Sequence, residues 1–402
     1  MAKSIFISYD GLMEPLGQSQ ILRYQERLAK EHQVFILSFE KPDDLADEGK
    51  FSAMKLHCEN NGIIWIPLRY HKKPSAIATA YDVLNGIRVA GQFIKRHRIE
   101  IVHARSYVPS VIALQLKKKF GIKYIFDMRG YWADERVDGG LWPSGGWLYK
   151  LAKWYEKKFL LNADSVVSLT QNAIDDMQTF GYLKNKDMKF ERITTCTDLD
   201  IFTLPTSAEL ERKHNDPFTL GYVGSVGTWY LFDETLKVFQ TLLKKIPDAQ
   251  FFIYNRGGHE FIKQRITALN VNPANIKIRE GNHHEVAEAM KKMHAAVFFY
   301  KPTYSKKATA PTRLGEFLGC GVPCLVNEGV GDMTSIVLNN QVGISIDKFD
   351  DKTLKDAVDD LIALSRSKDI SFKCRKVAEQ DFSLDEGVAS FSQIYKNINT
   401  LD

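Results

Sequence analysis

The chain has 402 residues, 44% apolar side chains and a formal net charge of +5, which is typical of a globular protein with two domains. No run of 18 or more apolar residues occurs and the first residues lead directly into a strand-like segment, so we expect neither a spanning helix nor a secretory signal. Residues 51–150 contain 16 basic and 7 acidic side chains, a bias too weak for a nucleic-acid binder, which directs attention to an anionic ligand or a membrane surface.

Short apolar runs alternate with segments of helical period through the first half of the chain. This alternation predicts a parallel, doubly wound sheet. The expected strands are Ile5–Tyr9, Val34–Phe39, Ile63–Pro67, Ile101–Ala104, Tyr124–Met128, Ser165–Leu169 and a segment near Lys189–Thr194. The expected helices are Gln18–Ala29, Ala76–Arg98, Val108–Phe120, Trp147–Leu161 and Gln171–Phe180.

Residues Asp198–Pro217 interrupt this order with prolines, charges and no apolar period, which predicts a linker. A second series follows, with strands Thr219–Val223, Gln250–Tyr254, Ile276–Arg279, Ala295–Tyr300, Pro323–Val326 and Gly343–Ile346. Its expected helices are Leu231–Ile246, Glu285–Met293, Pro311–Gly319 and Asp351–Leu364. The fold class is therefore α/β, with two Rossmann-like domains at residues 1–200 and 201–383.

Ligands of open α/β sheets bind beside the carboxyl ends of the strands, so the loops after the strands are the candidate sites. In the first of them, Gly17 lets the backbone approach a phosphate at the start of a helix, although a purely structural glycine is the alternative. The loop after Tyr124–Phe126 combines charge with aromatic rings, a composition suited to sugars. Its alternative is a loop packed on its own side chains. The candidates there are Asp127, Arg129, Tyr131 and Trp132.

Two loops of the second half carry the features of an anion site. The turn after Tyr222 offers the amides of Gly224 and Ser225 but lacks the glycine order of a nicotinamide-binding loop. Around the helix start at Pro311 lie Lys306, Lys307, Thr309 and Arg313, where cations and a helix dipole favour a diphosphate. One turn later, Glu316 is suited to accept two ribose hydroxyls. A basic surface loop with an exposed glutamate is the alternative.

Leu314–Leu325 resembles the donor-site helix and following strand of family 4 glycosyltransferases of the GT-B fold. Other segments resemble the same family in the same order: Ile101–Arg105, Asn162–Thr170, Thr195–Phe202, Asp381–Ser383 and Tyr395. The resemblance implies two domains facing each other across a cleft and a final helix, residues 384–402, that crosses back to the first domain. It also implies a retaining transfer without a metal or another cofactor.

Three departures from the family pattern qualify the transferred roles. The family commonly has Glu-x7-Glu, and Ala308 stands at the first position, so only the ribose role of Glu316 carries over. The Arg and Lys that often follow the first strand of the second domain are absent, so Lys306, Lys307, Arg313 or Arg256 must supply the positive charge. Asp127 occupies the position of a histidine found in many members.

The leading hypothesis is a retaining glycosyltransferase that moves a sugar from a nucleotide diphosphate sugar to a glycan or lipid-linked acceptor, in bacterial surface polysaccharide or glycolipid synthesis. Asp127, Arg129 and Lys307 are the catalytic candidates, with His103, Arg105, Tyr131 and Trp132 on the acceptor side. Two alternatives stay open, a nucleotide-sugar epimerase and a non-catalytic two-lobed binding protein.

The remaining expectations concern metals, location and partners. The literal Asp-x-Asp at Asp198–Asp200 lies in the expected linker and is interpreted as chance, so no metal site is expected. Five scattered cysteines suit reduced thiols in a cytoplasm. Basic groups in the first half suggest attachment to an anionic membrane surface on its inner face, and solvated helix ends and loops are the alternative. They are Arg69, His71, Lys72 and Lys73, then Lys95–Arg98, then Lys117–Lys119.

Overall fold

The computed structural model describes residues 1–399, and the chain forms two compact units. The N-unit comprises Met1–Ile193 and the segment from Asp385 onward, and the C-unit comprises Thr194–Leu384. The sequence placed the first boundary at residue 200. Residues 194–200 group with the C-unit because the Thr197 amide donates to the Phe382 carbonyl at 2.7 Å and Thr197 pairs with Ser383.

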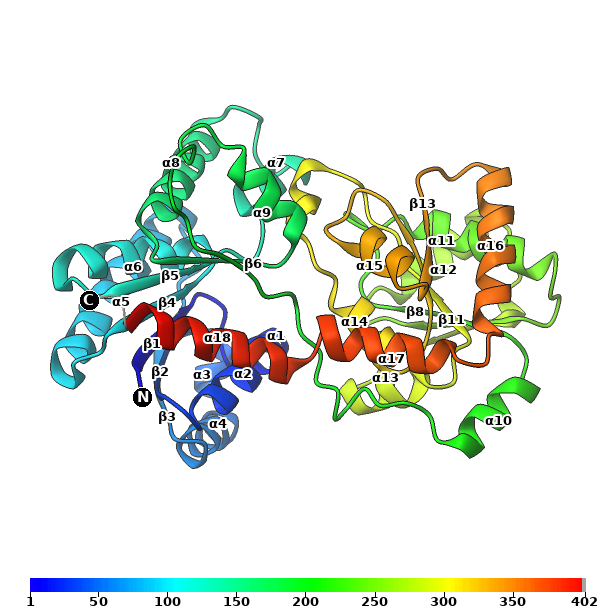
Figure 1. Ribbon diagram of the computed structural model, residues 1–402, viewed down its shortest axis with the longest axis horizontal. Helices are drawn as coiled ribbons and strands as arrows, with labels where there is room; N and C mark the ends of the chain where they lie inside the picture. The colour runs from blue at the N-terminus through cyan, green and yellow to red at the C-terminus, as the bar shows by residue number, and fades with distance from the viewer. Residues whose placement is uncertain (400–402) are drawn as a thin grey trace. The chain divides into compact units, whose positions relative to one another are not determined.

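The N-unit is built on a seven-stranded parallel sheet of order β3-β2-β1-β4-β5-β6-β7 (Figure 1). Its strands are β1 (Lys3–Ser8), β2 (Gln33–Glu40), β3 (Ile63–Arg69), β4 (Ile101–Arg105), β5 (Lys123–Asp127), β6 (Ser165–Ser168) and β7 (Phe190–Arg192). Its helical segments are α1 (Pro15–Gly17), the π-helical turn η1 (Gln18–Leu22), α2 (Arg23–Leu28), α3 (Pro42–Ala46), α4 (Glu48–Asn60), α5 (Ser75–His97), α6 (Tyr107–Phe120), α7 (Trp132–Asp138), α8 (Trp147–Asn162), α9 (Gln171–Gln178) and α18 (Leu384–Asn399).

The C-unit is built on a six-stranded parallel sheet of order β10-β9-β8-β11-β12-β13. Its strands are β8 (Thr219–Val223), β9 (Gln250–Tyr254), β10 (Ile276–Arg279), β11 (Ala295–Val297), β12 (Cys324–Asn327) and β13 (Gly343–Ile346). Its helices are α10 (Ser207–Asn215), α11 (Phe232–Leu243), α12 (His259–Ala268), η2 (Pro273–Asn275), α13 (His283–Met290), η3 (Tyr304–Ala308), α14 (Thr312–Gly319), α15 (Met333–Asn339), α16 (Asp351–Ser365) and α17 (Ile370–Asp381). Both sheets confirm the predicted α/β class.

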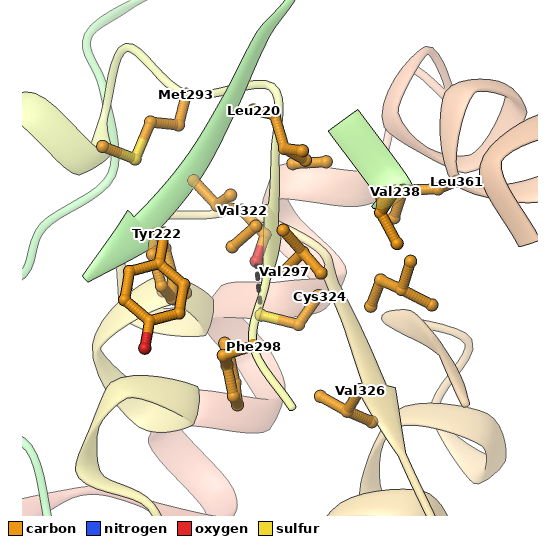
Figure 2. Packing of buried hydrophobic residues seen from close by; sticks show 14 of the residues in the cluster. Leu220, Tyr222, Val238, Met293, Val297, Phe298, Val322, Cys324, Val326 and Leu361 are labelled. Carbon is orange, nitrogen blue, oxygen red and sulfur yellow. Dashed lines mark hydrogen bonds between the residues drawn. The ribbon is translucent and has the colours of Figure 1, made fainter. Parts of the chain in front are cut away.

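The core of the C-unit lies where the central strands are covered on both faces. Figure 2 shows Leu220 of β8, Val297 of β11 and Cys324 of β12 packed among side chains of the flanking helices. Parallel strands buried on both faces need continuous apolar runs, and such runs predicted these strands. Because all strands run in one direction, their carboxyl ends share one edge in each unit, and the loops of the candidate site lie there.

The predicted linker is not irregular throughout. Residues Ser207–Asn215 form α10, which begins with a reciprocal cap in which the Thr206 amide donates to Glu209 at 2.7 Å and the Glu209 amide donates to the Thr206 hydroxyl at 3.3 Å. The helix was missed because it has almost no apolar period, so capping rather than burial marks it. The helices α3, α4, α7, α12, α15 and α17 were also not predicted, and α7 lies in the segment that was expected to be a long loop.

The C-terminal helix α18 packs on the N-unit, as the family resemblance implied. Arg27 on α2 forms an ion pair with Asp385 at 2.9 Å, and a ring nitrogen of His32 lies 2.9 Å from the Ser392 hydroxyl. Tyr395 contacts the buried His103. Residues 400–402 of the expected helix lie outside the described residues. Within residues 1–399, no helix is long and apolar enough to cross a membrane.

Candidate active site

The loop after β1 is held by a buried carboxylate at the end of β2. Glu40 accepts hydrogen bonds from the amides of Leu12 (2.8 Å) and Met13 (3.2 Å) and from the Ser38 hydroxyl (2.6 Å). A Cβ at Gly11 would lie 2.5 Å from a Glu40 carboxylate oxygen, and one at Gly17 would overlap the Gly11 carbonyl. Gly17 therefore allows a close backbone approach inside the loop, and its place in the first helical turn leaves its amide without an intrahelical carbonyl.

A buried charged cluster lies at the ends of β4 and β5. The Asp127 carboxylate is 3.7 Å from His103 Nε2 and 3.9 Å from Arg105 Nη1, and Arg105 Nε lies 3.8 Å from Asp10. His103 is fully buried and its Nδ1 lies 2.9 Å from the Tyr395 hydroxyl. Asp127 Oδ1 and His103 Nε2 are buried atoms without a hydrogen-bond partner within the described structure. A polar substrate group could therefore pair with Asp127 Oδ1.

The protonation states of this cluster follow from burial and from two arginines. Burial acts to raise the pKa of the Asp127 carboxyl, but the charges of Arg129 and Arg105 and the neighbouring His103 ring hold it below its usual value. Burial lowers the pKa of His103 in spite of Asp127, and burial with the nearby Arg129 lowers the pKa of Arg105 to about 10. At neutral pH the cluster thus holds an ionised aspartate, a neutral histidine and cationic arginines.

The aromatic loop between β5 and α7 uses much of its chemistry internally. The Tyr131 hydroxyl donates to Asp176 at 2.9 Å and to the Ala173 carbonyl at 3.1 Å. Trp132 is half-buried and packs edge-on against Trp142 with ring centres 5.1 Å apart. Of these predicted acceptor contacts, Trp132 keeps part of its surface exposed, whereas Tyr131 is buried.

In the C-unit, a glycine and an arginine form the centre of the predicted donor site. Gly224 directly follows β8 with a φ of 128°, and a Cβ there would overlap the Arg313 guanidinium. Four aromatic rings surround that guanidinium at 4.9–5.8 Å, those of Tyr222, Tyr230, Phe298 and Tyr300. Arg313 Nη1 is a buried donor without a hydrogen-bond partner in residues 1–399. A buried, unsatisfied cationic donor at a strand's carboxyl end is suited to an anionic ligand.

The other predicted donor-contacting residues differ in their surroundings. Lys306 is buried, with Nζ 4.0 Å from the centre of the Trp229 ring, whereas Lys307 is exposed beside Tyr304. Thr309 is half-buried after η3, and Ser225 and Arg256 are exposed in the loops that follow β8 and β9. Ala308, at the position of the missing glutamate, is buried.

Glu316 lies one turn beyond Arg313 on α14. Burial raises the pKa of its carboxyl to about 7, and the neighbouring Arg313 charge opposes this shift. Glu316 is half-buried, so its carboxylate is poorly solvated, and hydroxyl donors from a ligand would stabilise its ionised form.

Three features of the site were not predicted. Asn255, buried after β9, donates to the Gly224 carbonyl at 2.8 Å and accepts from the Gly258 amide at 2.6 Å, which fixes the loop after β8. Glu40 and the tyrosines around Arg313 are the other two. A polar residue directly after a strand was an available signal for Asn255 and Glu40, whereas no local pattern links the tyrosines to Arg313.

Two family models match the chain over the two units just described. Residues 18–188 match the "Glycosyl transferase 4-like domain" and residues 206–377 match "Glycosyl transferases group 1". The chain therefore belongs to the glycosyltransferases of the GT-B fold.

Solved structures agree with this fold at low sequence identity. A glycosyltransferase from Rickettsia africae superposes with a TM-score of 0.72 at 16% identity, and each chain is covered completely. Sucrose-phosphate synthase from Thermosynechococcus elongatus gives a TM-score of 0.72 at 13% identity, again over both complete chains. HepE from Anabaena, solved in complex with UDP and glucose, gives 0.68 at 12% identity, covering 98% of this glycosyltransferase and 100% of HepE. No curated protein matches the sequence of this glycosyltransferase.

Proposed function

We propose that this glycosyltransferase is a retaining enzyme that transfers a hexose from a nucleotide diphosphate sugar to a glycan or lipid-linked acceptor. The observation that carries the proposal is the Arg313 guanidinium, which fills the Cβ position of Gly224 and has a buried Nη1 donor without a hydrogen-bond partner. HepE, which has the same fold, is known in complex with UDP-glucose. We therefore propose UDP-glucose as the donor with which this site is tested. A diphosphate bound to Arg313 would supply the acceptor oxygens that the buried guanidinium lacks.

Departure of the diphosphate builds negative charge on its bridging oxygen, so the chief catalytic requirement is preorganised positive potential. On this proposal Arg313 and Lys306 bind the diphosphate, and the amides of Gly224 and Ser225 donate further hydrogen bonds to it. The exposed Lys307 approaches the leaving oxygen. These cations belong to the chain itself, and we propose that the transfer is independent of a metal and of any further cofactor.

The remaining donor contacts follow from the positions on α14 and in the neighbouring loops. Glu316 accepts the two ribose hydroxyls as a carboxylate, which the arginine one turn away favours electrostatically. Thr309 and Arg256 complete the proposed donor contacts in the C-unit, and the amide of Gly17 stays a separate expectation for an anionic group in the N-unit.

On the acceptor side, the ionised Asp127 and the cationic Arg129 orient sugar hydroxyls. His103 and Arg105, packed against Asp127, hold its charge and position. Tyr131 and Trp132 follow Arg129 in the same segment and are the aromatic residues proposed for the acceptor side. For retention, the acceptor hydroxyl attacks from the face on which the diphosphate departs, and a leaving phosphate oxygen takes its proton.

The biological setting is part of the same proposal. WaaG, a lipopolysaccharide biosynthesis glycosyltransferase, has the same fold with a TM-score of 0.63 at 17% identity. We place this enzyme in surface polysaccharide or glycolipid synthesis in the cytoplasm. Its five cysteines, all free and buried, suit that location.

A thermal-shift screen of nucleotides and nucleotide sugars tests the donor first. A nucleotide sugar that raises the melting temperature is then incubated with and without a mixture of glycan and lipid-linked acceptors, and the released nucleotide diphosphate and the anomeric configuration of the product are measured by NMR. Acceptor-dependent release with retained configuration supports the proposal. Conversion of the donor alone would indicate an epimerase, and binding without any product a non-catalytic protein.

A further inference from the structure

The first half of α5 carries an apolar surface that nothing in the N-unit covers. Ile77, Tyr81 and Leu84, here called the α5 stripe, are spaced i, i+4, i+7 and lie on one side of the helix. Their side chains are 70%, 57% and 68% exposed. The inner side of the helix is formed by other residues, among them the buried Ala78 and Ile94. The helix thus has two apolar sides, and only one is packed.

Helix α8 repeats this arrangement with larger side chains. Trp147, Leu151 and Trp154, here called the α8 stripe, have the same spacing and are 69%, 44% and 52% exposed. The inner side of α8 is closed by Phe159 and Leu160, which are fully buried. Two exposed tryptophans on one side of a helix form an apolar patch of the kind that marks an interaction surface.

The two stripes lie on one face of the N-unit and near one edge of its sheet. Helix α6 packs against both α5 and α8 (Figure 1), so the three helices cover the same face. Helix α5 leads into the start of β4 and α8 into the start of β6, so both run toward the amino ends of the strands. Each stripe occupies the first turns of its helix and therefore lies near the carboxyl ends of the strands, the edge that holds the Asp127 cluster.

Within the two segments that carry the stripes, residues 69–98 and 147–162, the exposed charged side chains have one sign. Residues 69–98 contain seven Lys and Arg side chains, all exposed, and the single acidic residue there, Asp82, is buried. Asp82 is engaged by the Tyr9 hydroxyl at 2.9 Å and by His71 Nδ1 at 2.6 Å. On α8, Lys150, Lys157 and Lys158 are exposed, while the one acidic residue, Glu156, is buried beside Lys153.

Apolar stripes with interfacial tryptophans and a surround of lysine and arginine match the chemistry of an anionic bilayer surface. We propose that the α5 stripe and the α8 stripe insert together into the headgroup region of an anionic membrane, with the flanking lysines and arginines on lipid phosphates. This goes beyond the basic groups seen in the sequence, of which Lys117 is bound to Asp164 at 2.6 Å and His71 to Asp82. The role of this membrane docking, which is access to a lipid-linked acceptor, rests on the proposed function.

Vesicle cosedimentation of the full chain tests the docking. The vesicles are phosphatidylcholine alone or mixed with phosphatidylglycerol. We expect the wild type to bind the anionic vesicles at least about tenfold more tightly. The double variants Ile77→Ser/Leu84→Ser and Trp147→Ser/Trp154→Ser should each lose about tenfold of that affinity. The matched control is Leu56→Ser on α4, because Leu56 is 57% exposed but belongs to neither stripe. It should bind like the wild type.

Brominated lipids provide a second readout that does not depend on the fraction sedimented. They should quench tryptophan fluorescence in the wild type, and Trp147→Phe/Trp154→Phe should remove that quenching. Equal binding to neutral and anionic vesicles, or stripe variants that bind like Leu56→Ser, would overturn the proposal, as would an acidic protein partner that the stripes bind in place of lipid. Nucleotide binding by calorimetry is read separately, so failure of vesicle binding with intact nucleotide binding removes only this inference.

Discussion

The guanidinium of Arg313 occupies the space that a side chain at Gly224 would need. Gly224 also has a φ of 128°, so a substitution there acts in two ways, through backbone strain and through displacement of the arginine. The two effects can be separated because Gly227, in the same loop, has a φ of 90° and open space around its Cβ position.

We expect Gly224→Ala to weaken the binding of a nucleotide diphosphate sugar by about tenfold or more, since Arg313 loses its position and a charge-assisted contact is worth about 1.5–3 kcal/mol. Gly227→Ala should lower the melting temperature about as much as Gly224→Ala does, because it adds backbone strain of about 1–3 kcal/mol. It should leave the affinity within about threefold, because it does not displace Arg313. Calorimetric titration with UDP-glucose measures both. Equal losses of affinity in the two variants would remove Arg313 from the donor site.

Removing the charge of Arg313 while keeping its volume should have a selective effect. Arg313→Met retains an apolar stem among the four aromatic rings, so we expect the fold to persist. Affinity for UDP should fall by about 10–100-fold, which corresponds to the loss of one or two charge-assisted hydrogen bonds. Affinity for uridine, which has no phosphate, should change little. A parallel loss for uridine and UDP would point to a collapsed site rather than a lost phosphate contact.

Much of the fold was readable from the chain because strands buried on both faces require uninterrupted apolar runs. Thr219–Val223, which is buried along most of its length, was predicted with the bounds that the structure has. The partly buried strands Gln250–Tyr254 and Gly343–Ile346 were also predicted with the bounds that the structure has. Helix α10 was not, because it is polar on nearly all sides and is marked by the Thr206–Glu209 cap alone.

The candidate site was less accessible to prediction for a different reason. The rings around Arg313 come from separate segments, so no spacing in the sequence brings Tyr222, Tyr230 and Tyr300 together. In the N-unit, the cluster of charges and aromatic rings marked the right loop, but it could not reveal that the Tyr131 hydroxyl donates to Asp176. Residue type suggests a role, whereas the burial that decides it arises only when distant segments pack.

The raised pKa of Glu316 predicts a pH-dependent donor affinity. If the ionised carboxylate binds the ribose hydroxyls, protonation below a pKa of about 7 competes with the ligand. Affinity for UDP-glucose, whose diphosphate does not titrate in this range, should rise about tenfold between pH 6 and pH 8. Glu316→Gln should bind more weakly at pH 8 and show a flat profile. A wild-type profile equally flat would contradict the assignment.

The same shift has a consequence for stability. Since the folded state holds the proton more tightly than the unfolded chain, Glu316 makes folding less favourable as pH rises from the usual value of 4.5 toward about 7. Glu316→Gln cannot ionise, so its melting temperature relative to the wild type should increase between pH 5 and pH 8. Scanning calorimetry without ligand measures the difference, and a constant offset would show that Glu316 titrates normally.

The hydrogen bond between Tyr395 and His103 should stabilise the docking of α18. Tyr395→Phe removes the hydroxyl that lies 2.9 Å from the buried His103 Nδ1 and leaves that nitrogen without this partner. We expect a loss of about 1–3 kcal/mol in the free energy of unfolding. Nucleotide affinity should not change, because the proposed diphosphate contacts at Arg313 and Gly224 lie in the C-unit. Denaturant titration and calorimetry report the two quantities, and an unchanged stability would mean that the hydroxyl is replaceable by water.

Asp127→Asn tests the proposed acceptor-side chemistry with a change of one atom. The variant keeps the size of the side chain but removes the negative charge between His103, Arg105 and Arg129, so it can no longer orient sugar hydroxyls as an anion. We expect kcat to fall by about 100-fold or more, a typical loss for a group that acts in the transition state, while UDP affinity stays within about twofold.

Because its pKa in the folded state is lowered, wild-type Asp127 also contributes stability above its usual value near 3.8, and this contribution is lost as pH falls through the lower folded value. The free energy of unfolding of Asp127→Asn should therefore decrease less steeply than that of the wild type as the pH falls. Full turnover in Asp127→Asn with unchanged acid stability would assign the cluster no part in transfer.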